Sequence, residues 1–146
     1  FSKGLMTTIG FDKKVISLIH VIDLVNGIYQ ASISEKAKNQ IYFISSEKFY
    51  TWDEVGEVCN NVFSKKPFKV KVPHSIVYFL AAIAQSFAVF SSKPATLNLE
   101  KAKDITRTAW ICDTSKATRD FGYRQNLSLK AGIRRTVEWY KEMKWL

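Results

Sequence analysis

The 146-residue sequence holds few groupings of residues that could carry out catalysis. Tyr140 and Lys144 have the Tyr-x-x-x-Lys spacing with which a reductase uses a lysine to lower the pKa of a catalytic tyrosine. No nucleotide-binding motif precedes this pair, and it lies where the last predicted helix would fray, so we interpret its spacing as accidental. Asp53 and Glu54 are explained by helix capping and by the helix dipole. We predict no catalytic residue in this chain.

Motifs that would hold a cofactor or a metal are also absent from the sequence. The six glycines are isolated, and none belongs to a G-x-G-x-x-G or G-x-x-x-x-G-K motif. Cys59 and Cys112 each lie in an apolar stretch, while His20 and His74 are far apart. We therefore predict buried, reduced thiols in a cytoplasmic protein, and neither a cofactor nor a metal bound by the chain itself.

Positive charge is the extreme feature of the composition, with 22 Lys and Arg against 13 Asp and Glu, a net charge of +9. Such an excess suits a polyanionic partner. The basic residues are scattered, however, without a run of about five or more like charges. We expect an ordinary basic surface and no nucleic-acid partner, and we keep a non-enzymatic basic binding module as an alternative function.

Residues 76–90 form the longest apolar stretch. As a helix this stretch would span about 22 Å, short of the roughly 30 Å hydrocarbon layer of a membrane. We therefore predict a buried or groove-lining helix. Contact with a membrane is not expected.

The hydrophobic pattern predicts one domain over residues 1–146, with six helices and about four short strands. Buried strands are predicted at residues 15–20 and 41–44, a half-exposed strand at 68–72 and a very short one at 110–112, with residues 1–14 as a loop or a frayed helix end. The helices are predicted to begin at Asp23, Thr51, Pro73, Asn98, Asp113 or Thr114, and Ser128, and Gly122 is predicted to end the fifth. The fold class is a small, mostly helical α/β domain with no room for a full parallel sheet.

Two stretches resemble one family of enzymes. Residues 19–27, Ile-His-Val-Ile-Asp-Leu-Val-Asn-Gly, are similar to the H-V-x-D-L-V segment of extended short-chain dehydrogenases/reductases, the NAD-dependent epimerase/dehydratase superfamily. Residues 110–117 resemble that family's W-x-x-D-x-S-K-A helix, and residues 120–123 and 127–140 resemble the L-G-(F/Y) and S-L-x-x-G-(I/L)-x-x-T-x-x-W segments that follow it. In this order the motifs cover nearly the whole chain.

The resemblance implies a division of labour between two parts of a longer protein. In the family, an N-terminal Rossmann half holds the glycine-rich NAD(P) loop and the catalytic Ser/Thr, Tyr and Lys, while a smaller C-terminal half covers the substrate. This chain resembles the second half alone, without the Rossmann sheet. We therefore expect a small-molecule substrate, a missing N-terminal Rossmann domain as partner, and NAD or NADP bound by that missing half. The fragment alone would be inactive, and a homodimer remains open.

Departures from the family pattern bear on the substrate. Sugar-nucleotide epimerases usually carry an arginine four residues before the histidine of H-V-x-D, where it grips the diphosphate, and this chain has Ile16 there. A second family arginine would fall near Lys103 or Arg107. We therefore expect the hydroxysteroid-dehydrogenase and dihydroflavonol-reductase branch, acting on an apolar alcohol or ketone. A sugar-nucleotide epimerase or dehydratase is the alternative.

The resemblance also selects candidate substrate-binding residues. The family's pocket-lining stretch falls on Thr7, Thr8 and Ile9. We add His20, from the H-V-x-D segment, and Lys103 as a partner for a phosphate. A structural role for His20 inside the domain is the alternative interpretation.

Overall fold

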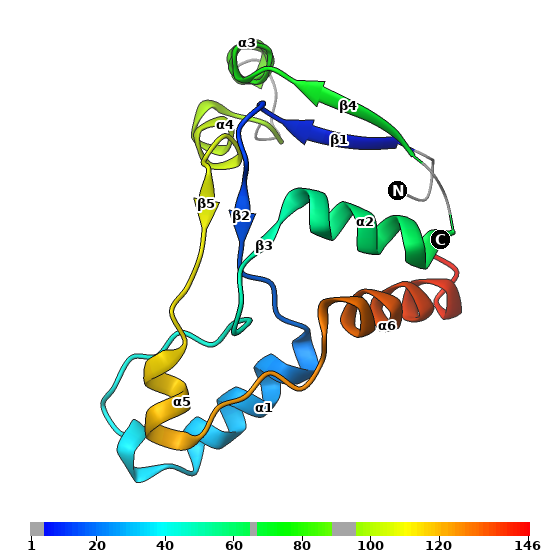
Figure 1. Ribbon diagram of the computed structural model, residues 1–146. Coiled ribbons are helices and arrows are strands. Elements are labelled where there is room, and N and C mark those ends of the chain that lie inside the picture. Colours follow the sequence, from blue (N-terminus) through cyan, green and yellow to red (C-terminus); the bar gives the residue numbers. More distant parts are fainter. Residues whose placement is uncertain (1–4, 65–66, 89–95) are drawn as a thin grey trace.

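Two small sheets form the spine of the molecule (Figure 1). The computed structural model describes residues 5–64, 67–88 and 96–146. In the first sheet, β1 (Leu5–Ile9) runs parallel to β4 (Phe68–Val72), with Leu5 opposite Phe68 and Ile9 opposite Val72. In the second, β2 (Val15–Ile16) lies between β3 (Tyr50–Thr51) and β5 (Ala109–Trp110).

The strands correct three predictions. Residues 5–9 form β1 and neither a loop nor a frayed helix end, because β4 supplies a partner far away in the sequence. The strand predicted at 15–20 is limited to Val15–Ile16, and the strand predicted at 110–112 is Ala109–Trp110. The half-exposed strand at 68–72 is confirmed.

Helices α2 (Trp52–Phe63) and α6 (Leu129–Glu142) pack side by side (Figure 1). The capping box predicted for α2 is present, since the Thr51 hydroxyl accepts from the Glu54 amide and the Glu54 carboxylate accepts from the Thr51 amide. These hydrogen bonds lower the pKa of Glu54, the backbone one most. Ser128 caps α6 as predicted. Between the two helices lies an apolar cluster of Tyr50, Val55 and Cys59 with Ile16, Leu18, Phe63, Leu129 and Ile133.

The cysteines differ in their burial. Cys59 is buried in this cluster, and burial raises the pKa of its thiol. Cys112 is only half-buried, so burial is confirmed for one thiol alone.

Helices α3 (His74–Ala88) and α4 (Leu99–Ile105) form a second packed pair. Asn98 caps α4 as predicted, accepting from the Lys101 amide at 2.8 Å. Their shared core consists of Val77, Ala81 and Ala102, with Ile9, Val72 and Leu97 against it. No helix within the described residues is long and apolar enough to cross a membrane.

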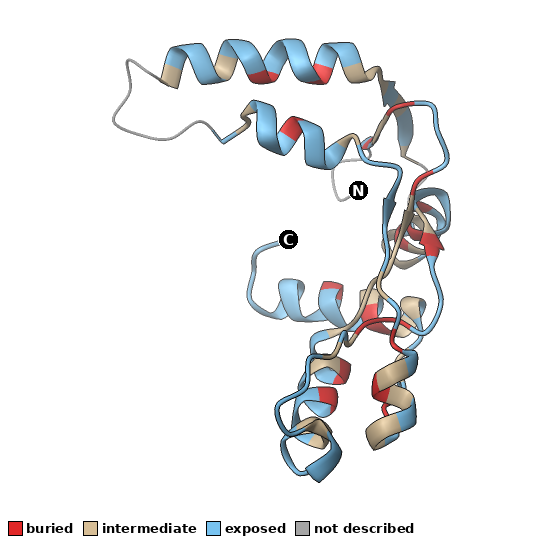
Figure 2. Ribbon diagram, turned by 90° about the vertical axis from the view of Figure 1, so that its left-hand side faces the viewer, coloured by how far each residue is buried: buried red, intermediate tan, exposed pale blue. Residues whose placement is uncertain are grey.

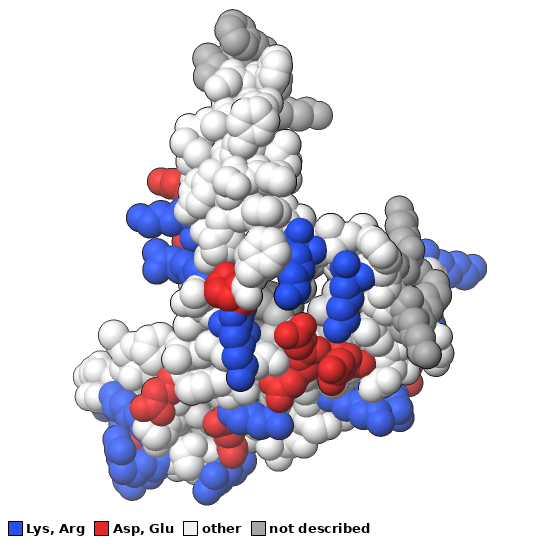
Figure 3. Space-filling model, turned by 45° about the horizontal axis from the view of Figure 1, so that its top comes forward, with Lys and Arg blue, Asp and Glu red and all other residues white. Residues whose placement is uncertain are grey.

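The long apolar helix is less buried than the sequence predicts. Only a narrow stripe of α3 enters the core, and its large side chains at Ile76, Phe79, Leu80, Ile83 and Phe87 are exposed. In Figure 3 uncharged side chains predominate among the described residues of the projecting region, and charged side chains lie along its flank and below it. Residues 89–90 of the predicted helix lie outside the described residues.

Helices α1 (Val21–Ser32) and α5 (Ser115–Phe121), with the short 3-10 helix η1 (Glu35–Ala37), form a third group. Gly122 ends α5 in the left-handed conformation as predicted, with φ of 74°. The strand predicted at 41–44 is not formed, because nothing in the described residues pairs with it.

The predicted cap of α1 at Asp23 is wrong. His20 is the cap, and its Nδ1 accepts from the Ile22 amide at 3.2 Å. Asp23 is instead fully buried, and its carboxylate accepts from the backbone amides of Asn126 and Leu127 at 3.1 and 3.0 Å. The aspartate therefore fastens the loop before α6 onto α1.

Within the described residues the protein is thus a small, mostly helical α/β domain without a Rossmann sheet, as predicted. Few residues along each helix are buried, as Figure 2 shows.

We expect Asp23→Ala to lower the free energy of unfolding by about 2–4 kcal/mol, because two backbone N–H groups lose their acceptor. Asp53→Ala, at an exposed acid in the first turn of α2, should cost less than about 1 kcal/mol. Urea denaturation of the two variants measures the difference. Equal costs would contradict the role assigned to Asp23.

The Tyr123 hydroxyl gives a second test, because burial first, and the charge of Asp23 next, raise the pKa of this phenol to about 12. An unfolded tyrosine titrates near pH 10. The folded state therefore favours the protonated phenol, and the stability that this preference contributes is complete below about pH 10 and is lost between about pH 10 and 12. The free energy of unfolding, measured against pH for the unchanged protein and for Tyr123→Phe, isolates the contribution of this hydroxyl. Identical slopes of the two curves above pH 10 would refute the role of Tyr123.

Candidate functional site

A cavity of about 400 Å³ lies between the first two strands and the corner that joins α4 to β5. This volume falls in the usual range for small-molecule pockets. Its wall is mainly apolar, with a few polar groups at the edge. The apolar wall consists of Ile9, Val15, Ile16, Trp52, Ile105 and Trp110.

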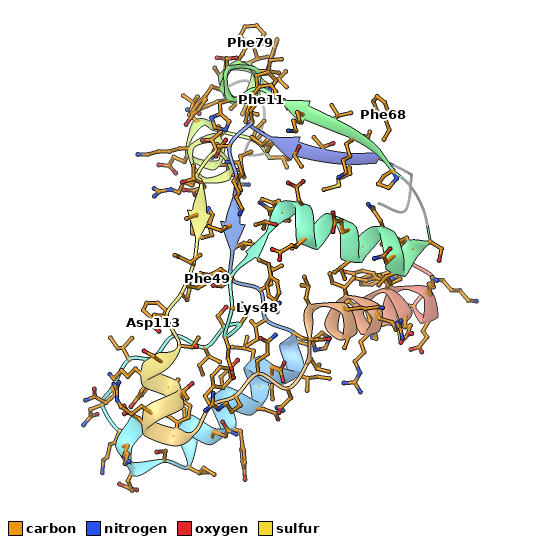
Figure 4. The ribbon with its side chains drawn as sticks, viewed as in Figure 1. Phe11, Lys48, Phe49, Phe68, Phe79 and Asp113 are labelled. Atoms are coloured by element: carbon orange, nitrogen blue, oxygen red, sulfur yellow. The ribbon has the colours of Figure 1, made fainter. Side chains whose placement is uncertain are left out.

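A smaller and more polar cavity of about 260 Å³ adjoins it. The two share Thr8, Ile9, Lys14 and Trp52 in their walls. Phe11, which Figure 4 shows at the turn after β1, lines the smaller one. The strand β1 and the turn after it therefore shape both cavities.

Lys14 joins the two sides of the larger cavity. Its side chain is only 7% exposed, and its Nζ donates to the carbonyl oxygens of Thr106 and Arg107, each at 2.8 Å. The Asp12 carboxylate lies 3.4 Å from the same Nζ. A lysine that donates to carbonyls at the end of a helix also interacts favourably with the helix dipole. Lys14 thereby fixes the end of α4 against β2.

Arg107 brings positive charge to the edge of this cavity. Its Nε lies 3.6 Å from the Asp104 carboxylate, and both side chains are about half exposed. Its guanidinium also lies 5.9 Å from the centre of the Trp110 ring, whose Nε1 donates to the Asp104 carbonyl at 3.2 Å. The guanidinium keeps donors free for a carboxylate or phosphate.

The turn after β1 requires glycine at position 10. Gly10 has a φ of 81°, and a Cβ there would collide with the His74 ring and the Asp12 carboxylate. His74 Nε2 lies 3.3 Å from Asp12 Oδ1. A backbone hydrogen bond, together with the Lys14 ammonium, lowers the pKa of Asp12. Asp12 therefore stays ionised beside Lys14 at neutral pH.

The structure brings some of the predicted site residues together. Thr7, Thr8 and Ile9 all line the larger cavity. Lys103 is exposed on α4 and does not line it, whereas Arg107 does. His20 lies elsewhere, in recesses between the start of α1 and α6, where it lines the wall together with Thr136.

Lys14 and Trp110 were not predicted as site residues. Lys14 stands beside Lys13 in the sequence and has the pattern of a solvated pair, so nothing local indicates its burial. Within the described residues, no group of three or more His, Cys, Asp or Glu side chains could hold a metal ion.

No model of a known protein family matches the chain. One curated protein, the uncharacterized protein y4nL of Sinorhizobium fredii, is 27% identical over 146 residues. That match covers 94% of this chain and 39% of the relative. The chain thus spans well under half the length of its curated relative.

Solved structures share the fold. UDP-glucose 4-epimerase from Thermotoga maritima, solved with UDP-glucose, has a TM-score of 0.67 at 17% identity, over 98% of this chain and 37% of its own. UDP-glucuronic acid 4-epimerase from Bacillus cereus, in complex with UDP-glucuronic acid and NAD, has a TM-score of 0.65 at 14% identity, over 95% and 36%. RMD from Pseudomonas aeruginosa, complexed with NADPH, has a TM-score of 0.64 at 8% identity, over 96% and 37%. At such identities the likeness establishes a common fold.

We expect Lys14→Met to lower the free energy of unfolding by about 2–4 kcal/mol, because it keeps the apolar stem but leaves carbonyls and Asp12 without their cation. Lys13→Met is the matched control, since the neighbouring lysine is exposed. Urea denaturation measures both. A Lys14→Met variant as stable as Lys13→Met would show that the ammonium does not hold the cavity walls together.

Proposed function

We propose that this chain is the C-terminal, substrate-binding part of an NAD(P)-dependent oxidoreductase or epimerase of the extended short-chain dehydrogenase/reductase superfamily. The observation that carries the proposal is the shared fold, which extends over 95–98% of the chain but only 36–37% of each of the epimerases UDP-glucose 4-epimerase and UDP-glucuronic acid 4-epimerase. The H-V-x-D and W-x-x-D-x-S-K-A resemblances support the same assignment.

In this proposal the cofactor belongs to the missing N-terminal half. Two of the similar structures hold NAD or NADPH, and this chain carries no glycine-rich nucleotide motif. The chain would contribute the cavity beside β1 and β2 as one wall of a site completed by the Rossmann domain. Ligand sites at domain interfaces are common, which supports this arrangement.

The substrate we favour is an apolar alcohol or ketone. Ile16 stands at the position of the family's diphosphate-gripping arginine, and it lines the cavity beside Ile9, Val15 and Ile105. Such a wall recognises a substrate by burial of apolar surface. It supports the hydroxysteroid-dehydrogenase and dihydroflavonol-reductase branch.

A sugar nucleotide is the second candidate, and Arg107 favours it. This arginine lines the cavity, and a guanidinium can bind a phosphate through two parallel hydrogen bonds. Thr7 and Thr8 would then contact the sugar, while Lys103 and His20 would act only if a bound partner reshaped the cavity. A cytoplasmic location, a homodimer and the absence of a nucleic-acid partner stay predictions.

Kinetics of the product of the complete reading frame distinguish the two substrates. For an apolar ketone, Arg107→Ala should change kcat/KM less than about threefold, whereas for a UDP-sugar it should lower kcat/KM at least about tenfold, the equivalent of 1.4 kcal/mol. Arg124→Ala is the control, at an exposed arginine that does not line the cavity. Absence of turnover with either substrate class and either nicotinamide cofactor would refute the proposal.

The 146-residue chain alone offers a second check by calorimetric titration with NADH and NADPH. We expect no binding at micromolar concentrations, since the cofactor site belongs to the missing half. Micromolar affinity of this chain alone would contradict the division of labour.

A further inference from the structure

Helix α3 turns small side chains toward the core and large ones toward the outside. Its fully or nearly buried residues are Val77 and Ala81, which pack against α4. Its large apolar side chains follow one another at the helical spacing i, i+3, i+4, i+7 and i+11, and they form what we call the α3 stripe: Ile76, Phe79, Leu80, Ile83 and Phe87. All five are exposed, Phe79 at 65% and Phe87 at 72%.

The remaining side of α3 is polar but carries no charge. The helix contains no Asp, Glu, Lys or Arg between His74 and Ala88. At about 100° per residue, Tyr78, Gln85 and Ser86 point away from both the core side and the α3 stripe. A helix with an open apolar side next to a polar side is typical of helices that lie in the interface of a membrane.

The chemistry of the α3 stripe favours lipid over protein as its partner. None of its five side chains has a hydrogen-bonding group. Protein interfaces carry about one hydrogen bond per 100–200 Å², whereas the acyl chains of a bilayer neither donate nor accept. The stripe runs for about 17 Å along the helix. A wholly apolar surface of this length matches the acyl region of one leaflet.

Positive charge lies beside this apolar surface. Lys101 and Lys103 are exposed on α4, one on either side of the residue that α4 buries against α3. The acids of α4 are Glu100 and Asp104, and Asp104 is paired with Arg107. Figure 3 shows charged side chains along the flank of the projecting region. With a net charge of +9 on the chain, this arrangement suits a surface of anionic lipid headgroups.

The core under α3 is continuous with the larger cavity. Ile9 packs against the apolar cluster of α3 and α4 and also lines the cavity. The Tyr78 hydroxyl lies 3.1 Å from Thr106 Oγ1, and the Thr106 carbonyl accepts from the buried Lys14 ammonium. The cavity wall is therefore fixed to the helix that carries the α3 stripe.

We propose that the α3 stripe binds a membrane surface. The five apolar side chains enter the acyl region of an anionic leaflet, and Lys101 and Lys103 lie among its headgroups. The expectation of no membrane contact assumed that this helix is buried, and the exposure of its large side chains removes that assumption. The contact itself goes beyond the proposed function. Its consequence, that an apolar substrate reaches the cavity from the lipid, rests on that function.

Co-sedimentation with vesicles tests the contact. We expect the product of the complete reading frame to bind vesicles of phosphatidylcholine and phosphatidylserine, and Phe79→Asp/Phe87→Asp to weaken this binding at least about tenfold. Phe68→Asp is the matched control, because Phe68 is 74% exposed at the end of β4 far from α3 (Figure 4). It should change binding less than about threefold. Absence of vesicle binding by the unchanged product, or equal losses in the two variants, would overturn the inference.

Charge reversal tests the headgroup contact. Lys101→Glu/Lys103→Glu should weaken binding to these vesicles at least about tenfold and should have little effect on vesicles of phosphatidylcholine alone. Lys141→Glu/Lys144→Glu is the control, at exposed lysines in and after α6, on the other side of the molecule from α3 (Figure 1). Binding that depends on lysines anywhere in the chain and not on Phe79 and Phe87 would show a merely basic surface, which contradicts the proposal.

A second measurement keeps the apolar character of the stripe and reports its depth. In Phe79→Trp, the added tryptophan should be quenched by vesicles whose acyl chains are brominated, whereas in Phe68→Trp it should not. The unchanged protein, with its four tryptophans, supplies the background. Equal quenching of the two added tryptophans would refute insertion of α3.

Two outcomes separate the membrane contact from the proposed function. Turnover with a nicotinamide cofactor and no binding to vesicles refutes the membrane contact and leaves the function standing. Vesicle binding that depends on the α3 stripe, without turnover of any substrate class, supports the contact and refutes the function.

Discussion

The buried ammonium of Lys14 is the interaction on which the arrangement of the cavity depends. It connects the turn after β1 with the end of α4, segments that are about ninety residues apart in sequence. Burying a charge is unfavourable unless its donors are satisfied, and here two carbonyls and the Asp12 carboxylate satisfy them. Because these acceptors are fixed in space, the position of the lysine also fixes Arg107.

Asp23 has the corresponding role at the other end of the molecule. It holds the chain at residues 126–127 against α1, so that α6 begins where it can pack on α2. Both buried charges hold distant segments together, a role that a larger apolar core has in a compact domain. The apolar clusters here are small, and large side chains remain exposed on α1 and α3. Long-range polar contacts therefore contribute much of the order between the helix groups.

The features that could be predicted from the sequence are those that depend on residues close together in the chain, such as helix ends. Thr51, Asn98 and Ser128 cap helices through amides three residues away, and Gly122 ends α5 through its own φ. Strand β1 depends on a distant partner, and the role of Asp23 depends on a loop about one hundred residues later. Among the residues that line the larger cavity, Thr7, Thr8 and Ile9 could be predicted only through the family resemblance. The place of Lys14 in its wall becomes visible only in the folded structure.

The strand predicted at residues 41–44 shows how a wrong prediction can still carry information. The local sequence favours a strand, and the segment alternates in exposure as a strand does. What it lacks is a partner among the described residues. A buried strand needs a partner for its backbone groups, and the local sequence alone therefore does not make these residues a strand. Arg107 likewise depends on its surroundings, because its half-exposed charge would bind an anion more strongly if water were excluded from the cavity.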